Sequence, residues 1–345
     1  MKPLSLRQSL KLIRQSLNAV SKSTLKQDNI LIGITGYVAS GKSRLCDLLK
    51  NEFSVLLQRP VLFLPFDLWI DIHNLYSSSN YSGRFLLEDL KEAVKCILLG
   101  KEFFVPRYDI MKTITERRDK NTIYPKEFKF DWNNRTFFPF SCPLIHKNLP
   151  GSIGLYIEPN KDYIYSFFPK SSNTTFIIDG TLVFPDEIKN CYHVKIFVQA
   201  SWPLRLARMV RRFNRNEIFG KTQKSLTKEI GFLVEEAKTC ADEEIRQQLT
   251  DDMIVVESTP DTLSNYLDLS YLKWLVSQPT TPQWITIDEI EKAMDDYIQN
   301  LKKECDPEII EAKRKELLAL TESKHLFILK DAGKLISDLS EALMS

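Results

Sequence analysis

Short apolar runs alternate along this chain with stretches in which apolar residues recur every three or four positions. The continuous runs lie at 29–36, 60–69, 174–184 and 192–200. The stretches with helical spacing lie at 42–53, 86–100 and 201–216. Continuous apolar runs are typical of strands buried on both faces, so the alternation predicts a parallel sheet with helices above and below it. We therefore expect an α/β fold.

Helical spacing also marks the N-terminal segment. Four apolar residues recur there at helical intervals among arginines and lysines, namely Leu6, Leu10, Ile13 and Leu17. The pattern predicts an amphipathic helix packed on the domain. A membrane-surface or targeting helix is the alternative.

The chain is predicted to be helical again beyond the stretch at 277–283. Thr286 and Glu289 have the spacing of a capping box, and the Asp-Pro pair at 306–307 predicts the start of a second helix. A last helical segment is expected over 326–343. Such a tail packs on the core or on a second copy of itself, and a module that binds another protein is the alternative.

Residues 118–174 interrupt the pattern of strands and helices. Their first part is dense in aromatic residues, which are Tyr124, Phe128, Phe130, Trp132, Phe137, Phe138 and Phe140. The letters IGLYIEPNKDYIYSFF at 153–168 place two β-rich arms around a Pro-Asn-Lys turn, which predicts a hairpin. We expect an insertion here within a core over 29–275. An N-terminal extension over 1–28 would precede this core, and a helical region over 280–345 would follow it.

Charge and cysteine usage narrow the range of partners. The 47 lysines and arginines nearly balance the 45 aspartates and glutamates, and a net charge of +2 gives no field that would hold nucleic acid or an anionic membrane. The six cysteines are scattered without the spacing of a disulfide framework or a zinc site. No stretch approaches the roughly 20 apolar residues of a membrane span. These features predict a soluble, cytoplasmic protein with neither nucleic-acid nor membrane partners.

The stretch from Gly36 to Ser43 reads GYVASGKS and fits the pattern G-x-x-x-x-G-K-[ST]. It has the predicted strand before it and the predicted helix after it that a phosphate-binding loop requires. Glycine lets the backbone turn so that successive N–H groups point at phosphate oxygens, and the helix dipole reinforces them. Lys42 would then reach the β- and γ-phosphates, and Ser43 would bind Mg²⁺.

The alternative to a phosphate site is a glycine turn that only opens a buried helix. Because the chain has only 11 glycines, a chance match to four fixed positions is rare, and the pattern favours a nucleotide with Mg²⁺. The residues expected to contact ATP are Gly36, Ala39, Ser40, Gly41, Lys42, Ser43 and Arg44.

Several stretches resemble the uridine kinase and phosphoribulokinase branch of the P-loop kinases, a group that also holds the pantothenate kinases. In the order of that family they lie at 34–49, 64–69, 82–109, 176–184, 194–215 and 251–258. The resemblance covers roughly 29–258 apart from the insertion. It implies the P-loop fold and transfer of the γ-phosphate of ATP to a small alcohol. It also implies that Asp67 faces the acceptor hydroxyl, and that Arg208 and Arg212 belong to an arginine-rich lid.

The chemistry of such a transfer needs the same groups. A metal, a residue that orients or deprotonates the hydroxyl, and positive charge for the phosphoryl oxygens must accompany the ATP cradle. Asp67 is expected at the carboxyl end of a buried strand, where it is the candidate base, with a helix cap or loop aspartate as the alternative. Asp179 ends another strand and is suited to hold Mg²⁺, although the family usually has glutamate there. The alternative to an arginine lid around Arg208 and Arg212 is a solvated helical face.

The acceptor side departs from the uridine kinases. The chain reads NYSGRFLLED at 80–89, where those kinases carry an aspartate for the ribose, and Thr113 stands where they have a histidine. Tyr108 is retained, and Arg84 or Arg107 could meet an anionic substrate. We expect a nucleoside as the first acceptor to test, and pantothenate, a sugar or a sugar phosphate as the alternatives. A third possibility is a nucleotide-binding regulator with little catalysis, in which the insertion and the helical tail bind a protein.

Overall fold

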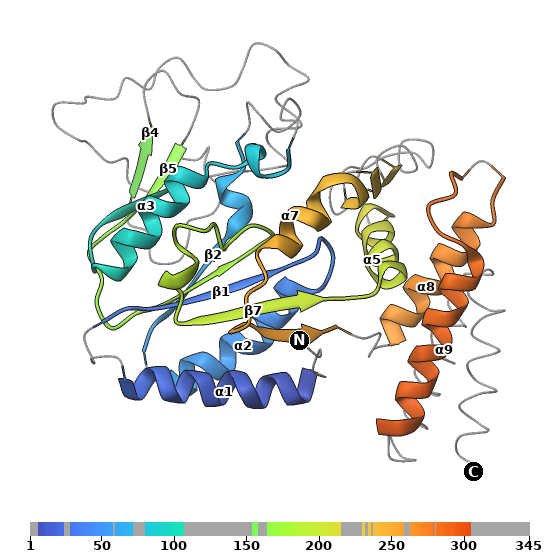
Figure 1. Cartoon of the computed structure of the whole chain (residues 1–345), viewed down its shortest axis with the longest axis horizontal. Helices are drawn as coiled ribbons and strands as arrows, with labels where there is room; N and C mark the ends of the chain where they lie inside the picture. The colour runs from blue at the N-terminus through green and yellow to red at the C-terminus, as the bar shows by residue number, and fades with distance from the viewer. Residues whose placement is uncertain are drawn as a thin grey trace. The chain divides into compact units, whose positions relative to one another are not determined.

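The computed structural model describes residues 6–23, 28–57, 59–71, 80–106, 154–157, 164–214, 230–231, 234–235, 237–258, 263–279 and 281–304. The chain divides into two compact units (Figure 1). The first unit consists of residues 1–37, 42–198 and 240–256, and the second of residues 38–41, 199–239 and 257–345.

A five-stranded sheet forms the centre of the first unit. Its strands, in the order in which they lie side by side, are β2 (Val61–Pro65), β6 (Thr175–Asp179), β1 (Ile30–Gly36), β7 (Val194–Gln199) and β8 (Ile254–Glu257). The pairs β2–β6, β6–β1 and β1–β7 are parallel. Every residue of the central strand β1 is buried, as its continuous apolar run predicts. The predicted α/β class is confirmed.

Helices cover both faces of this sheet, and Figure 1 shows α1 and α2 on one face and α3 and α7 on the other. Their bounds are α1 (Leu6–Ser23), α2 (Lys42–Leu57), α3 (Leu87–Leu98) and α7 (Asp242–Gln247). Ile13 and Leu17 of α1 are fully buried in a cluster with Leu45 and Leu49 of α2 and with Ile177 of β6. The predicted packing of the N-terminal amphipathic helix is therefore confirmed.

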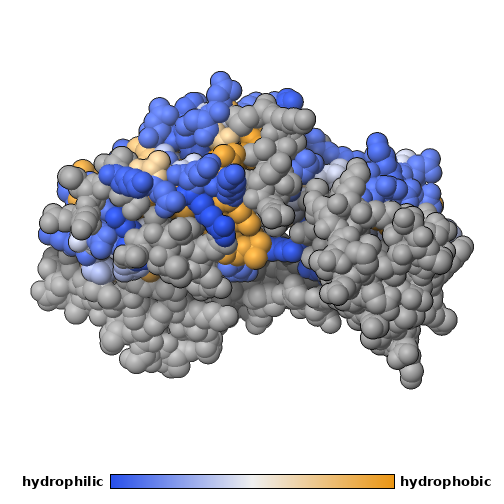
Figure 2. Space-filling view, turned by 90° about the horizontal axis from the view of Figure 1, so that it is seen from below, coloured by the Kyte–Doolittle hydropathy of each residue, from blue (hydrophilic) through white to orange (hydrophobic). Residues whose placement is uncertain are grey.

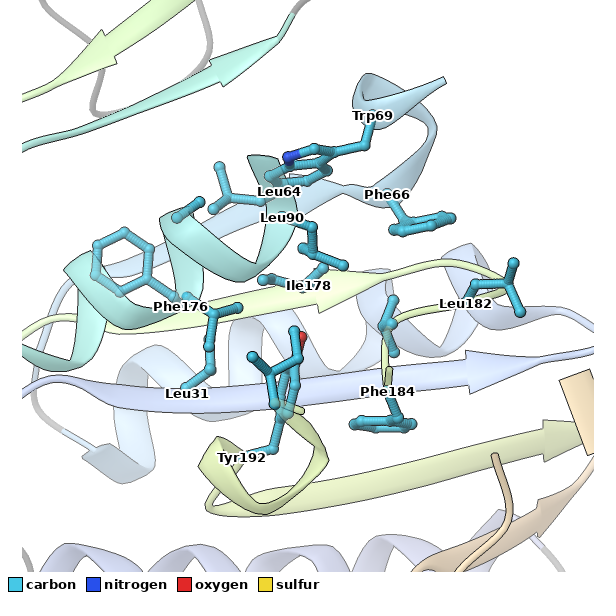
Figure 3. Packing of buried hydrophobic residues seen from close by; sticks show 14 of the residues in the cluster. Leu31, Leu64, Phe66, Trp69, Leu90, Phe176, Ile178, Leu182, Phe184 and Tyr192 are labelled. Carbon is cyan, nitrogen blue, oxygen red and sulfur yellow. The ribbon is translucent and has the colours of Figure 1, made fainter. Parts of the chain in front are cut away.

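Aromatic residues fill the other face of the sheet. Figure 3 shows Phe66, Trp69, Phe176, Phe184 and Tyr192 packed with leucines and isoleucines from the strands and from α3. The short helical turns on this side are η1 (Phe66–Trp69), η2 (Ser82–Arg84) and η3 (Lys189–Cys191). A one-turn π-helix, η4 (Ala237–Ala241), precedes α7. This core fixes the turn that follows β2.

A second, antiparallel sheet has three strands in the order β3 (Phe103–Pro106), β5 (Ile164–Phe168) and β4 (Gly154–Ile157). The pairing of β4 with β5 confirms the two arms of the predicted hairpin. Phe103 of β3 stacks on Phe168 of β5 with ring centroids 4.8 Å apart, so β3 belongs to the same sheet although it precedes the predicted insertion.

The described helices of the second unit are α5 (Trp202–Asn214), α8 (Leu263–Val276) and α9 (Ile287–Glu304). Their shared core includes Leu206, Tyr266, Leu269, Met294 and Tyr297. Because α8 and α9 share this core, the predicted boundary at 275–280 falls between two helices of one unit. The predicted helices from 306 onward lie outside the described residues.

The predicted capping box begins α9. Glu289 Oε2 accepts hydrogen bonds from Thr286 N at 2.9 Å and from Thr286 Oγ1 at 2.8 Å, and Glu289 N donates to Thr286 Oγ1 at 3.3 Å. These bonds satisfy backbone donors that a helix start leaves open, so this prediction is confirmed.

The surface of the described residues is largely hydrophilic on the face drawn in Figure 2, with a small group of apolar residues. The large apolar side chains that are exposed come from separate parts of the chain, namely Leu12, Leu48, Leu99, Phe104, Leu249 and Ile287. Single exposures of this kind are ordinary in folded proteins. None of the helices in the described ranges has the length and apolar character of a membrane span.

Candidate functional site

The loop between β1 and α2 has an unusual backbone. Gly36, Ala39 and Gly41 have φ angles of +150°, +60° and +103°. A Cβ atom on Gly36 would collide with the carbonyl of Val198, and one on Gly41 would lie 3.2 Å from Ser258 Oγ. Glycine is therefore favoured by conformation at both motif positions, and at Gly36 the space also excludes a side chain. The predicted strand, glycine turn and helix are confirmed.

Lys42 stands in the first turn of α2 and bonds to the start of the loop. Its Nζ atom donates to Gly36 O at 2.8 Å and to Tyr37 O at 2.9 Å. In a trans peptide the N–H group points away from the C=O group. Because the carbonyls of Gly36 and Tyr37 face Lys42, the N–H groups of Tyr37 and Val38 point away from it. Ser43 and Arg44 follow Lys42 on exposed positions of the same turn.

Asp179 ends β6 at the carboxyl edge of the sheet, in register with Ile34 of β1 and Pro65 of β2. Burial raises the pKa of its carboxyl to about 6; Lys42 opposes this shift, and the negative charge of Asp67 adds to it. Such a carboxyl is stabilised as the anion by a cation bound beside it.

Cys46 is a neighbour of Asp179 that the sequence did not single out. It is buried on α2, burial raises the pKa of its thiol, and it forms a hydrogen bond with Asp179. The protonated thiol can therefore donate to the carboxylate. A cysteine among the apolar residues of a helix gives no sequence signal for this contact.

We expected Asp67 at the end of a strand, and this prediction is wrong. Strand β2 ends at Pro65, and Asp67 lies in the first turn of η1 with its side chain exposed. Phe66 and Trp69, fully buried on either side, anchor this turn and leave Asp67 on its outer side. The negative charge of Asp67 still raises the pKa of Asp179. The two predicted carboxylates therefore lie near enough to interact, at one edge of the sheet.

The arginines of α5 bond to the middle of the loop within the second unit. Arg208 donates from Nη1 to Ala39 O at 3.3 Å and to Ser40 O at 3.0 Å. Arg205 Nε donates to Val38 O at 2.9 Å. The side chain of Arg212 lies outside the described residues. The lid stays a prediction, and the described arginines contact the backbone of the loop.

Arg84, a predicted substrate contact, lies in η2 with its guanidinium 5.8 Å from the ring of Tyr81. The turn that carries it is fixed by Glu244 of α7, which accepts hydrogen bonds from Tyr81 N at 2.7 Å and Ser82 N at 2.8 Å. Sequence reasoning missed Glu244, because the polar residues around it are typical of any exposed helix and give no signal for this contact. The predicted Arg107 and Tyr108 lie outside the described residues.

Gln248, just after α7, fixes the loop that follows Asp179. Its Nε2 atom donates to Thr181 O at 2.7 Å, and its Oε1 atom accepts from Phe184 N at 2.9 Å. Thr35 Oγ1 donates to the same Thr181 carbonyl at 2.8 Å. These bonds tie the end of β6 to β1 and so fix the position of Asp179.

The residues fit a magnesium ion that is bound together with phosphate. Mg²⁺ is usually held by one or two protein carboxylates, waters and substrate phosphates. Asp179 supplies a carboxylate at the sheet edge, and Ser43 supplies a hydroxyl in the first turn of α2. Within the described ranges no three histidine, cysteine or acidic side chains come together as a metal site.

No family model and no curated protein matches this sequence. Among solved structures, the chain is similar to a candidate fructose transport system kinase from Silicibacter sp. TM1040, with 16% identity, a TM-score of 0.41, and coverage of 71% of this chain and 97% of that one. It is also similar to a candidate uridine kinase from Bacillus stearothermophilus, with 13% identity, a TM-score of 0.32, and coverage of 60% and 90%. Both of these proteins are described as kinases.

Proposed function

We propose that this chain is an ATP-dependent kinase that transfers the γ-phosphate to the hydroxyl of a small molecule. The observation that carries the proposal is the loop from Gly36 to Gly41, with its left-handed residues between a buried parallel strand and a helix. Lys42 follows this loop, and Asp179 ends the neighbouring strand. A loop of this form gathers backbone N–H groups around phosphate oxygens.

Four candidate site residues of the first unit then have distinct proposed roles. Lys42 binds the β- and γ-phosphates, and the hydroxyl of Ser43 and the carboxylate of Asp179 hold Mg²⁺. The bound ion would supply positive charge for the phosphate oxygens as the phosphoryl group is transferred. Asp67, which is exposed at the same sheet edge as Asp179, accepts the proton of the acceptor hydroxyl.

The acceptor is proposed to be a nucleoside such as uridine, on the resemblance of the motifs. Pantothenate, a sugar or a sugar phosphate is the second candidate, and Arg84 of η2 is the proposed contact for the anionic group of pantothenate or of a sugar phosphate. A nucleotide-binding regulator with little catalysis is the candidate of a different class. We place the reaction in the cytoplasm, where thiols such as Cys46, Cys96 and Cys191 stay reduced.

An acceptor screen with ATP and Mg²⁺, measured as ADP release, tests the kinase proposal. We expect one alcohol to raise turnover, and Asp67→Asn to lower kcat by roughly 10²- to 10⁴-fold, because the amide cannot take the proton. Asp186→Asn is the matched control, since Asp186 is exposed and pairs with Lys189 on the surface.

The opposite outcome would support the regulator. ATP would bind the wild type, no alcohol would raise ADP release, and a tagged full-length chain would capture a partner protein that a chain ending at Glu304, the last residue of α9, does not capture. Equal kcat values for Asp67→Asn and the wild type would instead remove Asp67 from the proposed mechanism while leaving the kinase reaction in place.

A further inference from the structure

Three successive carbonyl groups of the loop accept hydrogen bonds from arginines of α5. Arg205 Nε donates to Val38 O at 2.9 Å. Arg208 Nη1 donates to Ala39 O at 3.3 Å and to Ser40 O at 3.0 Å. All five residues belong to the second unit. One side of the loop backbone is therefore covered by two cations.

Both arginines are themselves fixed. Arg208 Nη2 donates to Ser258 Oγ at 3.1 Å, and its Nε atom donates to Asn265 Oδ1 at 3.4 Å. The residue Arg205 is 3% exposed, and its guanidinium lies 5.2 Å from the ring centroid of Trp202. An arginine held by several partners keeps its donors in place at little further entropic cost. These two side chains are therefore part of the support of the loop.

Holding the carbonyls also orients the amides. In a trans peptide the C=O of one residue and the N–H of the next point in opposite directions. Arginines on the carbonyls of residues 38–40 therefore direct the N–H groups of residues 39–41 to the other side of the loop. The positive charge also polarises each peptide, which makes its N–H a stronger donor toward an anion.

The loop needs such support because its conformation is strained. Ala39 has a φ of +60°, in the left-handed region that residues other than glycine seldom adopt. Strained backbone of this kind persists where the surroundings determine it. A loop that is held in its binding conformation beforehand loses less freedom when the anion arrives, so it binds more tightly.

We propose that Arg205 and Arg208 are positioning residues that hold the loop amides ready for the β-phosphate of nucleoside di- and triphosphates. They act from behind the loop and not on the transferred phosphate. This inference rests on the proposed nucleotide binding. It predicts that each arginine contributes equally to the binding of ADP and ATP, whereas an arginine over the γ-phosphate would contribute to ATP alone.

Titration calorimetry of the full chain with ADP and with ATP, each with Mg²⁺, tests the inference. For Arg208→Met we expect the affinity for both nucleotides to fall by the same factor, about 10- to 100-fold, because the bonds lost involve a charged donor. In the acceptor assay the KM for ATP should rise more than kcat falls. Arg208→Lys should recover part of the affinity, since an ammonium can still bond to one carbonyl.

Arg211→Met is the matched control on the same helix. Arg211 pairs with Asp268 at 3.0 Å, and we expect its loss to leave nucleotide affinity within about twofold of the wild type. Should Arg208→Met not fold, as judged by circular dichroism, Ser258→Ala replaces it. That variant removes one partner of Arg208, and a smaller but equal loss for ADP and ATP is expected.

The two failures are distinguishable. A wild type that binds neither ADP nor ATP overturns the proposed function, and the inference with it. A wild type that binds both, together with an Arg208→Met variant that loses affinity for ATP but keeps that for ADP, overturns the inference alone and places Arg208 on the γ-phosphate.

Discussion

At the scale of single residues, Asp179 gives the clearest pH dependence. Its pKa of about 6 in the folded protein lies above the ordinary aspartate value of 3.8, so the folded protein binds more protons than the unfolded chain between these two pH values. The stabilisation that protonation provides is complete below pH 3.8 and is lost as the pH rises through 6. With about 1.36 kcal/mol for each unit of pKa, the loss is about 3 kcal/mol.

Asp179→Asn has no such carboxyl to ionise. In metal-free protein we expect the free energy of unfolding of the variant, relative to the wild type, to rise by about 2–3 kcal/mol between pH 4 and pH 7.5. Urea titrations at the two pH values, with a chelator present, measure this difference. Asp186→Asn serves as the surface control, and a constant difference between Asp179→Asn and the wild type would contradict the prediction.

Sequence reasoning found the residues whose roles depend on local spacing. Gly36, Gly41 and Lys42 could be predicted because a phosphate loop requires fixed residue types at fixed intervals. The bonds of Arg208 to the loop carbonyls and of Glu244 to the backbone of Tyr81 could not be predicted. They depend on how α5 and α7 pack within their own units, and no short-range pattern encodes that.

At the scale of the elements, the start of α9 offers a direct test. Thr286→Ala removes the hydroxyl that exchanges hydrogen bonds with Glu289, and we expect it to lower the free energy of unfolding by about 1 kcal/mol. Urea unfolding followed by far-ultraviolet circular dichroism measures the change. Thr286→Ser keeps the hydroxyl and should stay within about 0.5 kcal/mol of the wild type. Equal losses for the alanine and serine variants would mean that the cap does not stabilise the helix.

Strands and helices could be predicted where burial sets a clear period. The apolar run at 60–69 predicts a single strand, but it covers two elements. Strand β2 ends at Pro65, and the buried residues Phe66 and Trp69 belong to the helical turn that follows. The place of β3 was missed for a different reason. Its partner β5 lies some 60 residues later along the chain, and strand pairing over that separation leaves no local mark.

At the scale of the whole molecule, the sequence predicted the α/β class but not the division into units. The second unit is assembled from three separate segments, the shortest of which is the four loop residues 38–41. Alternating strands and helices indicate a parallel sheet, yet they carry no record of which distant segments share a core. The order β2-β6-β1-β7-β8 likewise follows from tertiary packing and not from any one element.

The last prediction concerns the stability of the entire chain. A ligand that binds only the folded state stabilises it by about 2.7 kcal/mol at 100 times its Kd. For a chain of 345 residues this corresponds to a rise in Tm of roughly 4 °C. We expect MgATP to produce this rise in the wild type and no rise in Lys42→Ala at the same ATP concentration, since the variant lacks the ammonium that binds the phosphates. Lys189→Ala, which loses a surface pair with Asp186, should respond as the wild type does. Differential scanning fluorimetry with and without MgATP measures the shift, and an equal shift in Lys42→Ala would show that the nucleotide binds elsewhere.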